Sequence, residues 1–188
     1  METPAPFHQS IALVVIDLQA PFLKAIASSD SIVKRGSFAM EAAQLLDIPV
    51  LITEQVPEKL GPTAPDVLRL VNAPHVFPKN AFSCFGAEGF GQWLVEHKIE
   101  GLLICGLETP ICVFQTIRDA LREGINVTLL TDAVGGRRAE DHNAIYNFLA
   151  DRTEASLLPA ETVFYSLIGE ATHPKFREFT ALVKKYNN

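Results

Sequence analysis

Residues 101–120 read GLLICGLETPICVFQTIRDA, and this stretch decides the fold of the chain. Leu102 to Cys105 form a short apolar run bounded by glycines, which predicts a buried strand. Gly106 permits the sharp turn that follows. Thr109 can cap a helix, and Pro110 suits its first turn, where a missing N–H costs nothing. The stretch therefore predicts a strand, a tight turn and a helix.

Cys112 falls in the first turn of that predicted helix. Free N–H groups and the positive end of the helix dipole lie there, and both favour a thiolate. A nucleophile is one interpretation of Cys112; the other is packing, because free cysteine is among the most buried residue types. Cys105, in the middle of the strand, is predicted to belong to the core. Cys84 is predicted to pack near a pocket.

The same alternation of strand and helix runs along the whole chain. The predicted strands are 11–16, 50–52, 75–79, 102–105, 126–130 and 161–165. The predicted helices are 28–46, 65–71, 88–98, 109–124, 138–150 and 174–186. This order predicts an α/β fold, a doubly wound and mainly parallel six-stranded sheet with helices on both faces. No linker or repeat interrupts it, so residues 1–188 are expected to form a single domain.

Composition excludes several classes of protein. The net charge is −6 and no Lys/Arg cluster stands out, which argues against a nucleic-acid partner. No apolar run is long enough to span a membrane, and Met1 to Ser10 do not resemble a signal peptide. Three cysteines at spacings that suggest no disulfide framework favour the cytoplasm. The absence of CxxC and HExxH pairs predicts no metal motif, and no cofactor is expected.

Three polar residues come at the ends of predicted strands or just beyond them: Asp17, Lys79 and Cys112. Open α/β sheets bind ligands at the carboxyl ends of their strands, so the three could share one crevice. A lysine cation lowers the pKa of a nearby thiol, and a carboxylate can take the thiol proton. Asp17 and Lys79 also have ordinary interpretations, Asp17 as a helix cap or turn former and Lys79 as a solvated surface residue. The five histidines follow no matching pattern and are expected to be structural or exposed.

Three motifs carry a family resemblance: ALVVIDLQ at 12–19, FPKNAFS at 77–83 and GLETPICVFQT at 106–116. In this order and spacing they resemble the isochorismatase-like cysteine hydrolases, also called nicotinamidase-related amidohydrolases. The resemblance implies the same α/β sandwich that the strand pattern predicts. It also implies a homo-oligomer, and the phenylalanine-containing helix at 176–183 could pack on the core or on a neighbouring subunit.

The resemblance assigns roles to individual residues. Cys112 would attack a carbonyl carbon, Asp17 would accept and return the proton, and Lys79 would hold the pair and stabilise the thiolate. A cis peptide bond is implied between Leu107 and Glu108. The backbone N–H groups of Glu108 and Cys112 would then form the oxyanion hole.

One region departs from the nicotinamidase pattern. Nicotinamidases of this family bind a metal through an Asp and histidines after the second strand, whereas residues 53–63 here read TEQVPEKLGPT. This segment has no histidine, so we expect no metal and do not expect nicotinamide as substrate. It resembles the short isochorismatase-domain members instead. Candidates for the pocket wall, for which packing or capping within the loops is an equal alternative, are Gln19, Phe22, Glu54, Gln55 and Phe82.

The nucleophile narrows the expected reaction. Cleavage of the vinyl ether of isochorismate would need no cysteine, so Cys112 favours hydrolysis of an amide-like C–N bond in a small molecule. Two other classes remain open. The chain could be a non-catalytic binding or assembly protein on the same fold, or a thiol redox protein that uses Cys112 with Cys84 or Cys105.

Overall fold

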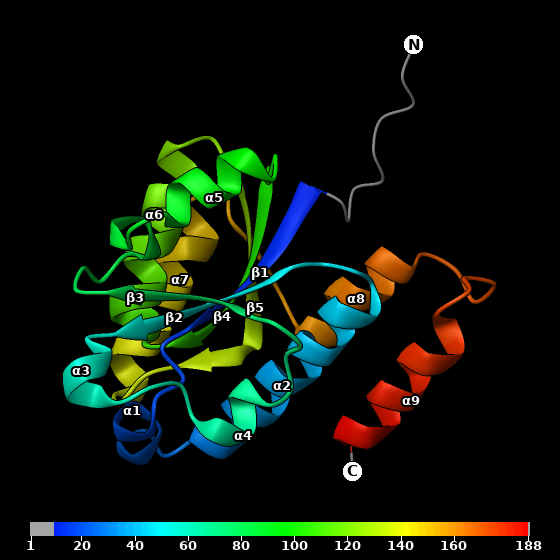
Figure 1. The fold of residues 1–188 in the computed structure, drawn as a ribbon, viewed down its shortest axis with the longest axis horizontal. Helices are drawn as coiled ribbons and strands as arrows, with labels where there is room; N and C mark the ends of the chain where they lie inside the picture. Colours follow the sequence, from blue (N-terminus) through cyan, green and yellow to red (C-terminus); the bar gives the residue numbers. More distant parts are fainter. Residues whose placement is uncertain (1–9, 188) are drawn as a thin grey trace.

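The computed structural model describes residues 10–187, so His8 and most of the N-terminal segment in which no signal peptide is expected lie outside the described residues. Within this range six strands form one parallel sheet in the order β3-β2-β1-β4-β5-β6 (Figure 1). The strands are β1 (Ile11–Ile16), β2 (Val50–Gln55), β3 (His75–Lys79), β4 (Gly101–Leu107), β5 (Asn126–Gly135) and β6 (Ser156–Leu158). The predicted α/β fold with a six-stranded parallel sheet is confirmed.

The two central strands, β1 and β4, are buried along their whole length. Their continuous apolar sequences fit this position, because both faces of a parallel sheet are covered. In the register of the pair, Leu13 lies beside Leu103 and Ile16 beside Gly106. Gly106 has a φ of +112°, and a Cβ there would lie 2.1 Å from the Ile16 carbonyl oxygen. Only glycine therefore allows the end of β4 to approach β1 so closely.

Helices cover both faces of the sheet (Figure 1). One layer contains α2 (Ser29–Leu45), α8 (Ala160–Ile168) and α9 (Phe176–Asn187), and the other contains α5 (Phe90–Glu96), α6 (Phe114–Arg122) and α7 (Ala139–Arg152). The first layer packs around Phe38, Phe164 and Phe179, and the second around Phe90 and Ile117. Within residues 10–187 no helix has the length and apolar character needed to cross a bilayer.

The carboxyl ends of β1 to β4 each lead into short helical elements. These are α1 (Ala20–Ala25), α3 (Pro57–Leu60), α4 (Pro65–Leu68), the 3₁₀ turn η2 (Cys84–Gly86) and the π-helical turn η3 (Thr109–Val113). The register brings Ile16 beside Thr53, and Gln55 beside Lys79. Four connections therefore meet above one edge of the sheet, where the sequence predicts the ligand site.

The predicted sixth strand at 161–165 is wrong, because these residues lie inside helix α8. Val163 and Phe164 favour strands by propensity, but together with Ala160 and Ile168 they form one buried stripe at helical spacing. The Phe164 ring meets the Phe38 ring edge-on at 5.9 Å. The sixth strand is instead β6, which lies between the predicted helix at 138–150 and the predicted strand at 161–165.

The end of the fifth strand also differs from the sequence prediction. β5 continues to Gly135, so most of the predicted loop after Leu130 is strand, with a register shift against β4 between Ile104 and Gly106. Asp132 in this extension accepts a hydrogen bond of 2.8 Å from the Ala160 N–H at the start of α8.

The last helix, α9, packs on the core at one point at least, because Phe179 is buried and its ring lies 6.1 Å from that of Phe38. The two alternatives for this helix, the core or a neighbouring subunit, are thereby resolved in part.

Candidate active site

Asp17 follows β1 directly and is 1% exposed. Its backbone is left-handed, with a φ of +53°, and its N–H donates to the Thr53 carbonyl at 3.2 Å. The carboxylate accepts a hydrogen bond of 2.9 Å from the Thr53 hydroxyl and one of 2.7 Å from Lys79 Nζ. Asp17 is not a helix cap, because the N-cap of α1 is Gln19, but it does form a tight turn in which its carbonyl accepts from the Gln19 N–H at 2.7 Å. The Asp17 side chain points to β2 and β3.

Lys79 ends β3 and is 3% exposed, so it is not the solvated surface residue of its ordinary interpretation. The ammonium group donates to Asp17 Oδ2 and to Gln55 Oε1, both at 2.7 Å. A buried ammonium is costly unless it is paired and hydrogen-bonded, and these two contacts meet that need. The register of β2 with β3 makes this possible, since Gln55 and Lys79 are direct neighbours.

Cys112 lies 5% exposed in the turn η3, between β4 and α6. Its Sγ donates to Gln55 Oε1 at 3.8 Å, so the thiol and the Lys79 ammonium share one acceptor atom. The sequence predicts Cys112 in the first turn of an α-helix; the structure has a π-helical turn before α6. Thr109 is not its cap either. The Thr109 hydroxyl contacts His142 Nδ1 at 3.0 Å instead.

The expectation that Cys112 has a lowered pKa is wrong. Burial and, to a lesser extent, the neighbouring Asp17 charge raise the pKa of the Cys112 thiol to about 12, and the Lys79 ammonium only partly offsets them. Desolvation penalises the charged form of any buried acid, and here it outweighs the cation. The resting side chain is therefore a neutral thiol beside a carboxylate.

Glu108 joins β4 to η3 through a cis peptide bond with Leu107, as the resemblance implies. Its carbonyl oxygen accepts from the N–H groups of Ile111 at 3.0 Å and Val113 at 3.2 Å, which closes the turn around Cys112. The Glu108 side chain is buried and pairs with Arg137 Nε at 2.8 Å. The oxyanion role of the Glu108 and Cys112 N–H groups stays a prediction.

The five pocket-wall candidates separate into different environments. Gln55 faces the thiol and the ammonium. Gln19 and Glu54 are buried and tie down loops: Gln19 bonds the Gln55 backbone and the Gly61 carbonyl, and Glu54 accepts from the Thr63 N–H at 2.7 Å. Phe22 packs partly buried against the core, whereas Phe82 is 59% exposed.

The other two cysteines, Cys84 and Cys105, are buried among packed side chains. Cys105 is buried in β4, and burial raises its pKa to about 12. Cys84 begins η2, and its Sγ lies 3.3 Å from the Thr116 hydroxyl and 3.8 Å from the Thr53 hydroxyl. Cys84, Cys105 and Cys112 are all free thiols. Cys84 therefore packs directly behind the residue that binds Asp17, close to where the sequence predicts it.

The segment after β2 is where the sequence predicts no metal. Within residues 10–187, no group of three or more His, Cys, Asp or Glu side chains is arranged to hold an ion. Glu54 is engaged by a backbone N–H, and the Gln55 oxygen by Lys79 and Cys112. These side chains stabilise loops and the candidate site, and a metal-free protein remains our prediction.

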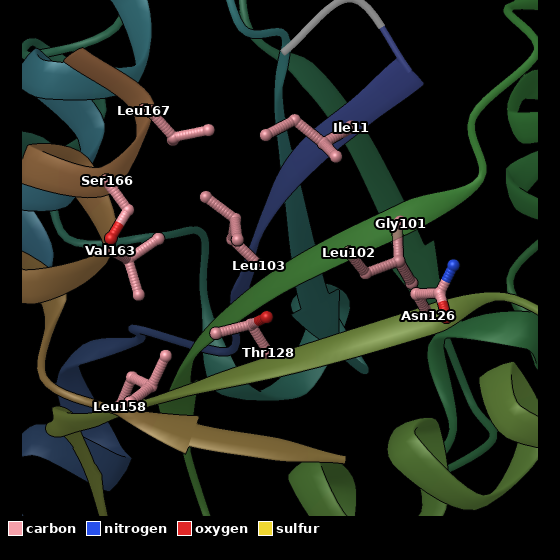
Figure 2. A pocket seen from close by; sticks show the side chains of 10 residues that line it. All are labelled: Ile11, Gly101, Leu102, Leu103, Asn126, Thr128, Leu158, Val163, Ser166 and Leu167. Carbon is pink, nitrogen blue, oxygen red and sulfur yellow. The ribbon is translucent and has the colours of Figure 1, made fainter. Parts of the chain in front are cut away.

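Two hollows in the surface lie at different distances from the sheet edge where Asp17, Lys79 and Cys112 meet. An apolar pocket of about 200 Å³ lies at the opposite end of the strands, lined by Ile11, Gly101 and Asn126 and by Val163 and Leu167 of α8 (Figure 2). A second hollow of about 570 Å³ borders η3 and the β5–α7 connection, and Glu108, Ile111 and Arg137 line it. Only the second adjoins the turn that contains Cys112.

Residues 11–160 match the isochorismatase domain. The chain belongs to the isochorismatase family. It is 31% identical over 179 residues to isochorismatase domain-containing protein 2A of Mus musculus, an alignment that covers 94% of this chain and 84% of the mouse protein. The predicted family is thereby confirmed, and its hydrolase fold agrees with the α/β sheet described above.

Solved structures of the same fold extend the comparison. A MAR1 ribonuclease from Caenorhabditis elegans is similar with a TM-score of 0.88 and 31% identity, over 94% of this chain and 90% of that one. The YcaC gene product of Escherichia coli, described as an octameric hydrolase of unknown specificity, shares the fold with a TM-score of 0.76 and 16% identity, over 100% of this chain and 98% of that one.

In this isochorismatase-family chain, sequence reasoning missed three residues around the candidate site. Thr53 binds the Asp17 carboxylate, Arg137 pairs with Glu108, and His142 contacts Thr109. Thr53 could have been found, since it belongs to the same strand end as Gln55. Arg137 and His142 come from the β5–α7 segment and carry no local signal for this contact.

Proposed function

We propose that this chain is a cysteine hydrolase that cleaves an amide-like C–N bond of a small molecule through a covalent Cys112 intermediate. The observation that carries the proposal is the chain of contacts from Cys112 Sγ to Gln55 Oε1, to Lys79 Nζ and on to Asp17 Oδ2. A thiol, a buried cation and a buried carboxylate are thereby gathered at one sheet edge. Membership of the isochorismatase family supports a hydrolase in general.

In the first half-reaction, Cys112 Sγ would attack the carbonyl carbon while its proton passes to Asp17. The raised pKa of the thiol fits this order, because a neutral thiol needs a base at the moment of attack. The oxyanion would receive hydrogen bonds from the Glu108 and Cys112 N–H groups. Collapse of the tetrahedral intermediate would break the C–N bond, with Asp17 returning the proton to the leaving nitrogen.

In the second half-reaction, water would attack the thioester carbonyl. Asp17 would take a proton from that water, and the same N–H groups would stabilise the second oxyanion. Breaking the C–S bond would release a carboxylic or carbamic acid, and the proton on Asp17 would return to Cys112 Sγ. Lys79 holds the Asp17 carboxylate in place throughout and lowers the cost of thiolate character on Cys112.

The test is a screen of small amides, ureides and carbamates for released ammonia, comparing the native chain with Cys112→Ala. The matched control is Cys105→Ala, which removes a buried thiol that lies in the strand and outside the contact chain. We expect turnover that Cys112→Ala abolishes and Cys105→Ala retains. Turnover that survives Cys112→Ala would overturn the covalent mechanism.

A second candidate function comes from the C. elegans neighbour, whose name describes a ribonuclease. Its 31% identity makes RNA cleavage worth testing in the same screen. The net charge of −6 argues against affinity for a polyanion, because binding of nucleic acid is carried largely by Lys and Arg contacts to phosphates. Cleavage of labelled RNA that depends on Cys112 would favour this candidate over C–N hydrolysis.

We further propose that the chain acts in the cytoplasm as a homo-oligomer. Free Cys84, Cys105 and Cys112 fit a reducing compartment, and the E. coli YcaC product of the same fold is described as octameric. Light scattering of the purified chain measures the mass of the assembly, and a mass equal to one chain would contradict the oligomer. Cell fractionation tests the compartment.

A further inference from the structure

We propose that Arg137 is a positioning residue for the oxyanion site and that it acts through the buried Glu108 carboxylate. This inference rests on the proposed function, which places the oxyanion against the Glu108 N–H. The role proposed for Arg137 needs no contact with the substrate, because its ion pair is with the Glu108 side chain. In this role the Glu108–Arg137 ion pair holds the turn after β4 at a fixed position above the sheet.

The Glu108 carboxylate is engaged by Arg137 in two ways. Arg137 Nε lies 2.8 Å from one oxygen and 3.1 Å from the other, and the Arg137 backbone N–H donates to the second oxygen at 3.0 Å. A carboxylate that is 5% exposed is costly to bury without such partners. The Arg137 side chain is 56% exposed, so the pair contributes little to stability by burial of charge.

The backbone of Glu108 connects this ion pair to Cys112. The Glu108 carbonyl accepts the N–H groups of Ile111 and Val113, which flank Cys112 on both sides. The Glu108 N–H and C=O belong to the two peptide units that meet at its Cα, so rotation about the backbone bonds at this Cα would turn the N–H relative to the turn that contains the nucleophile. An ion pair on the side chain of this residue restrains that rotation.

The β5–α7 segment holds the same turn at two further points. The His142 ring contacts the buried Thr109 hydroxyl at 3.0 Å. Gly136 packs so closely that a Cβ there would lie 3.1 Å from Pro110 Cδ and 3.6 Å from a Glu108 carboxylate oxygen. The Glu108–Arg137 pair is thus the charged part of a clamp between β5–α7 and η3.

The alternative is that the pair only stabilises the fold of this connection. Two reactions of Cys112 separate the two roles. Alkylation by iodoacetamide displaces iodide at a saturated carbon and forms no oxyanion. Acetaldehyde adds the thiol across its C=O bond, so that a C–S bond forms, the π bond breaks and the thiol proton passes to an oxygen that would occupy the oxyanion site. Acetaldehyde should therefore protect Cys112 reversibly from iodoacetamide.

The experiment compares the native chain with Arg137→Ala, Arg137→Lys and Glu108→Gln. The matched control is Arg138→Ala, because Arg138 is the next residue, is exposed, and forms its ion pair with Asp141 of α7 at 3.4 Å. We expect Arg137→Ala to weaken protection by acetaldehyde on the order of 10- to 100-fold, the range typical of a small misplacement in a site. Its rate of alkylation without acetaldehyde should stay close to that of the native chain.

Rescue distinguishes positioning from general loss of structure. Arg137→Lys should recover part of the protection, since an ammonium can reach the Glu108 carboxylate but lacks the guanidinium fork. Guanidinium ion, added far below denaturing concentration, should also recover part of it in Arg137→Ala, because Arg137 lines the hollow of about 570 Å³. Equal protection in the native chain and Arg137→Ala would overturn the clamp, as would a parallel fall in both reactions. Absence of protection in the native chain would instead overturn the oxyanion site, and the proposed function with it.

Discussion

Lys79 Nζ and Asp17 Oδ2 lie 2.7 Å apart in an ion pair whose side chains are 0% and 1% exposed. Two opposite charges are thus removed from water at the edge of the sheet, with Thr53 and Gln55 supplying the remaining hydrogen bonds. Breaking such a pair leaves one charge uncompensated. We expect Lys79→Met to lower the free energy of unfolding by about 3–5 kcal/mol, measured by urea denaturation.

The control for Lys79→Met is Lys185→Met, which breaks the exposed pair between Lys185 and Glu41 on the helical layer far from the site. An exposed pair contributes only about 0–1 kcal/mol, so this variant should unfold nearly as the native chain does. If the two variants were destabilised equally, the Lys79–Asp17 pair would not have the buried, compensated character that we assign to it.

The rate at which Cys112 is alkylated should depend on pH, and this rate can be measured without a substrate. Burial and the Asp17 charge raise the pKa of its thiol to about 12. The thiolate fraction, and with it the rate of alkylation by iodoacetamide, should therefore keep rising about tenfold per pH unit between neutral pH and the raised pKa. Cys84 falls in another tryptic peptide, and fragmentation of the tryptic peptide 99–118, which contains both Cys105 and Cys112, locates the label at Cys112 and gives its rate.

The unfolded chain is the reference for this profile. In urea, alkylation of the same cysteine should level off above the ordinary thiol pKa of about 8.5. The same difference makes stability depend on pH. Above the ordinary thiol pKa, Cys112 loses its proton in the unfolded chain but keeps it in the folded chain. The folded chain therefore becomes less stable as the pH rises toward the raised pKa of Cys112. A plateau below pH 8 in the folded protein would contradict the neutral resting thiol.

Gly106 tests the close approach of β4 to β1. A Cβ at this position would lie 2.1 Å from the Ile16 carbonyl oxygen, and the backbone φ is +112°. We expect Gly106→Ala to destabilise the chain by more than about 4 kcal/mol, because two central strands would have to separate. The melting temperature or the yield of folded protein measures this.

Gly91 gives the matched comparison, since a Cβ there meets nothing within 4 Å and the residue lies in α5. Gly91→Ala should stabilise the chain by roughly 0.5–1 kcal/mol through helix propensity. Equal effects of the two substitutions would show that the approach of β4 to β1 is not tight.

Periodicity and strand-end positions predicted most of this architecture, and the misses have identifiable causes. The buried runs of β1 and β4 were readable because parallel strands need continuous apolar sequence, although β4 continues through Gly106 to Leu107 where the sequence predicts a turn after Cys105. Residues 161–165 were misassigned because Val163 and Phe164 favour strands locally, whereas their burial against Phe38 is decided by tertiary packing.

The candidate site was predictable only in part for a similar reason. Asp17, Lys79 and Cys112 stand at strand ends or just past a turn, so topology alone brings them to one edge. The pKa of Cys112 was predicted in the wrong direction, because the sequence reveals the Lys79 cation but not the depth of burial. Arg137 was missed because its contact with Glu108 spans 29 residues of sequence.

Gln55 makes the sharpest test of the contact chain itself. Its Oε1 accepts from Lys79 at 2.7 Å and from the Cys112 thiol at 3.8 Å, and its Nε2 donates to the Asn80 carbonyl at 2.9 Å. Gln55→Leu keeps the size but removes all three contacts, and it leaves a buried ammonium with one acceptor fewer. We expect a loss of about 1–3 kcal/mol in stability.

We expect Gln55→Leu to lower the catalytic rate more than it lowers the stability. The reason is that the Cys112 thiol and the Lys79 ammonium both lose the oxygen that fixes their relative positions. In the ammonia-release assay kcat should fall, and the urea midpoint should shift only in proportion to the lost hydrogen bonds. Gln92→Leu is the control: Gln92 lies exposed on α5 and its side chain donates to Glu96 of the same helix, so both quantities should stay within experimental error. A Gln55→Leu protein with native kcat would mean that Lys79 and Cys112 are positioned by other groups, and the shared acceptor would then have no part in the reaction.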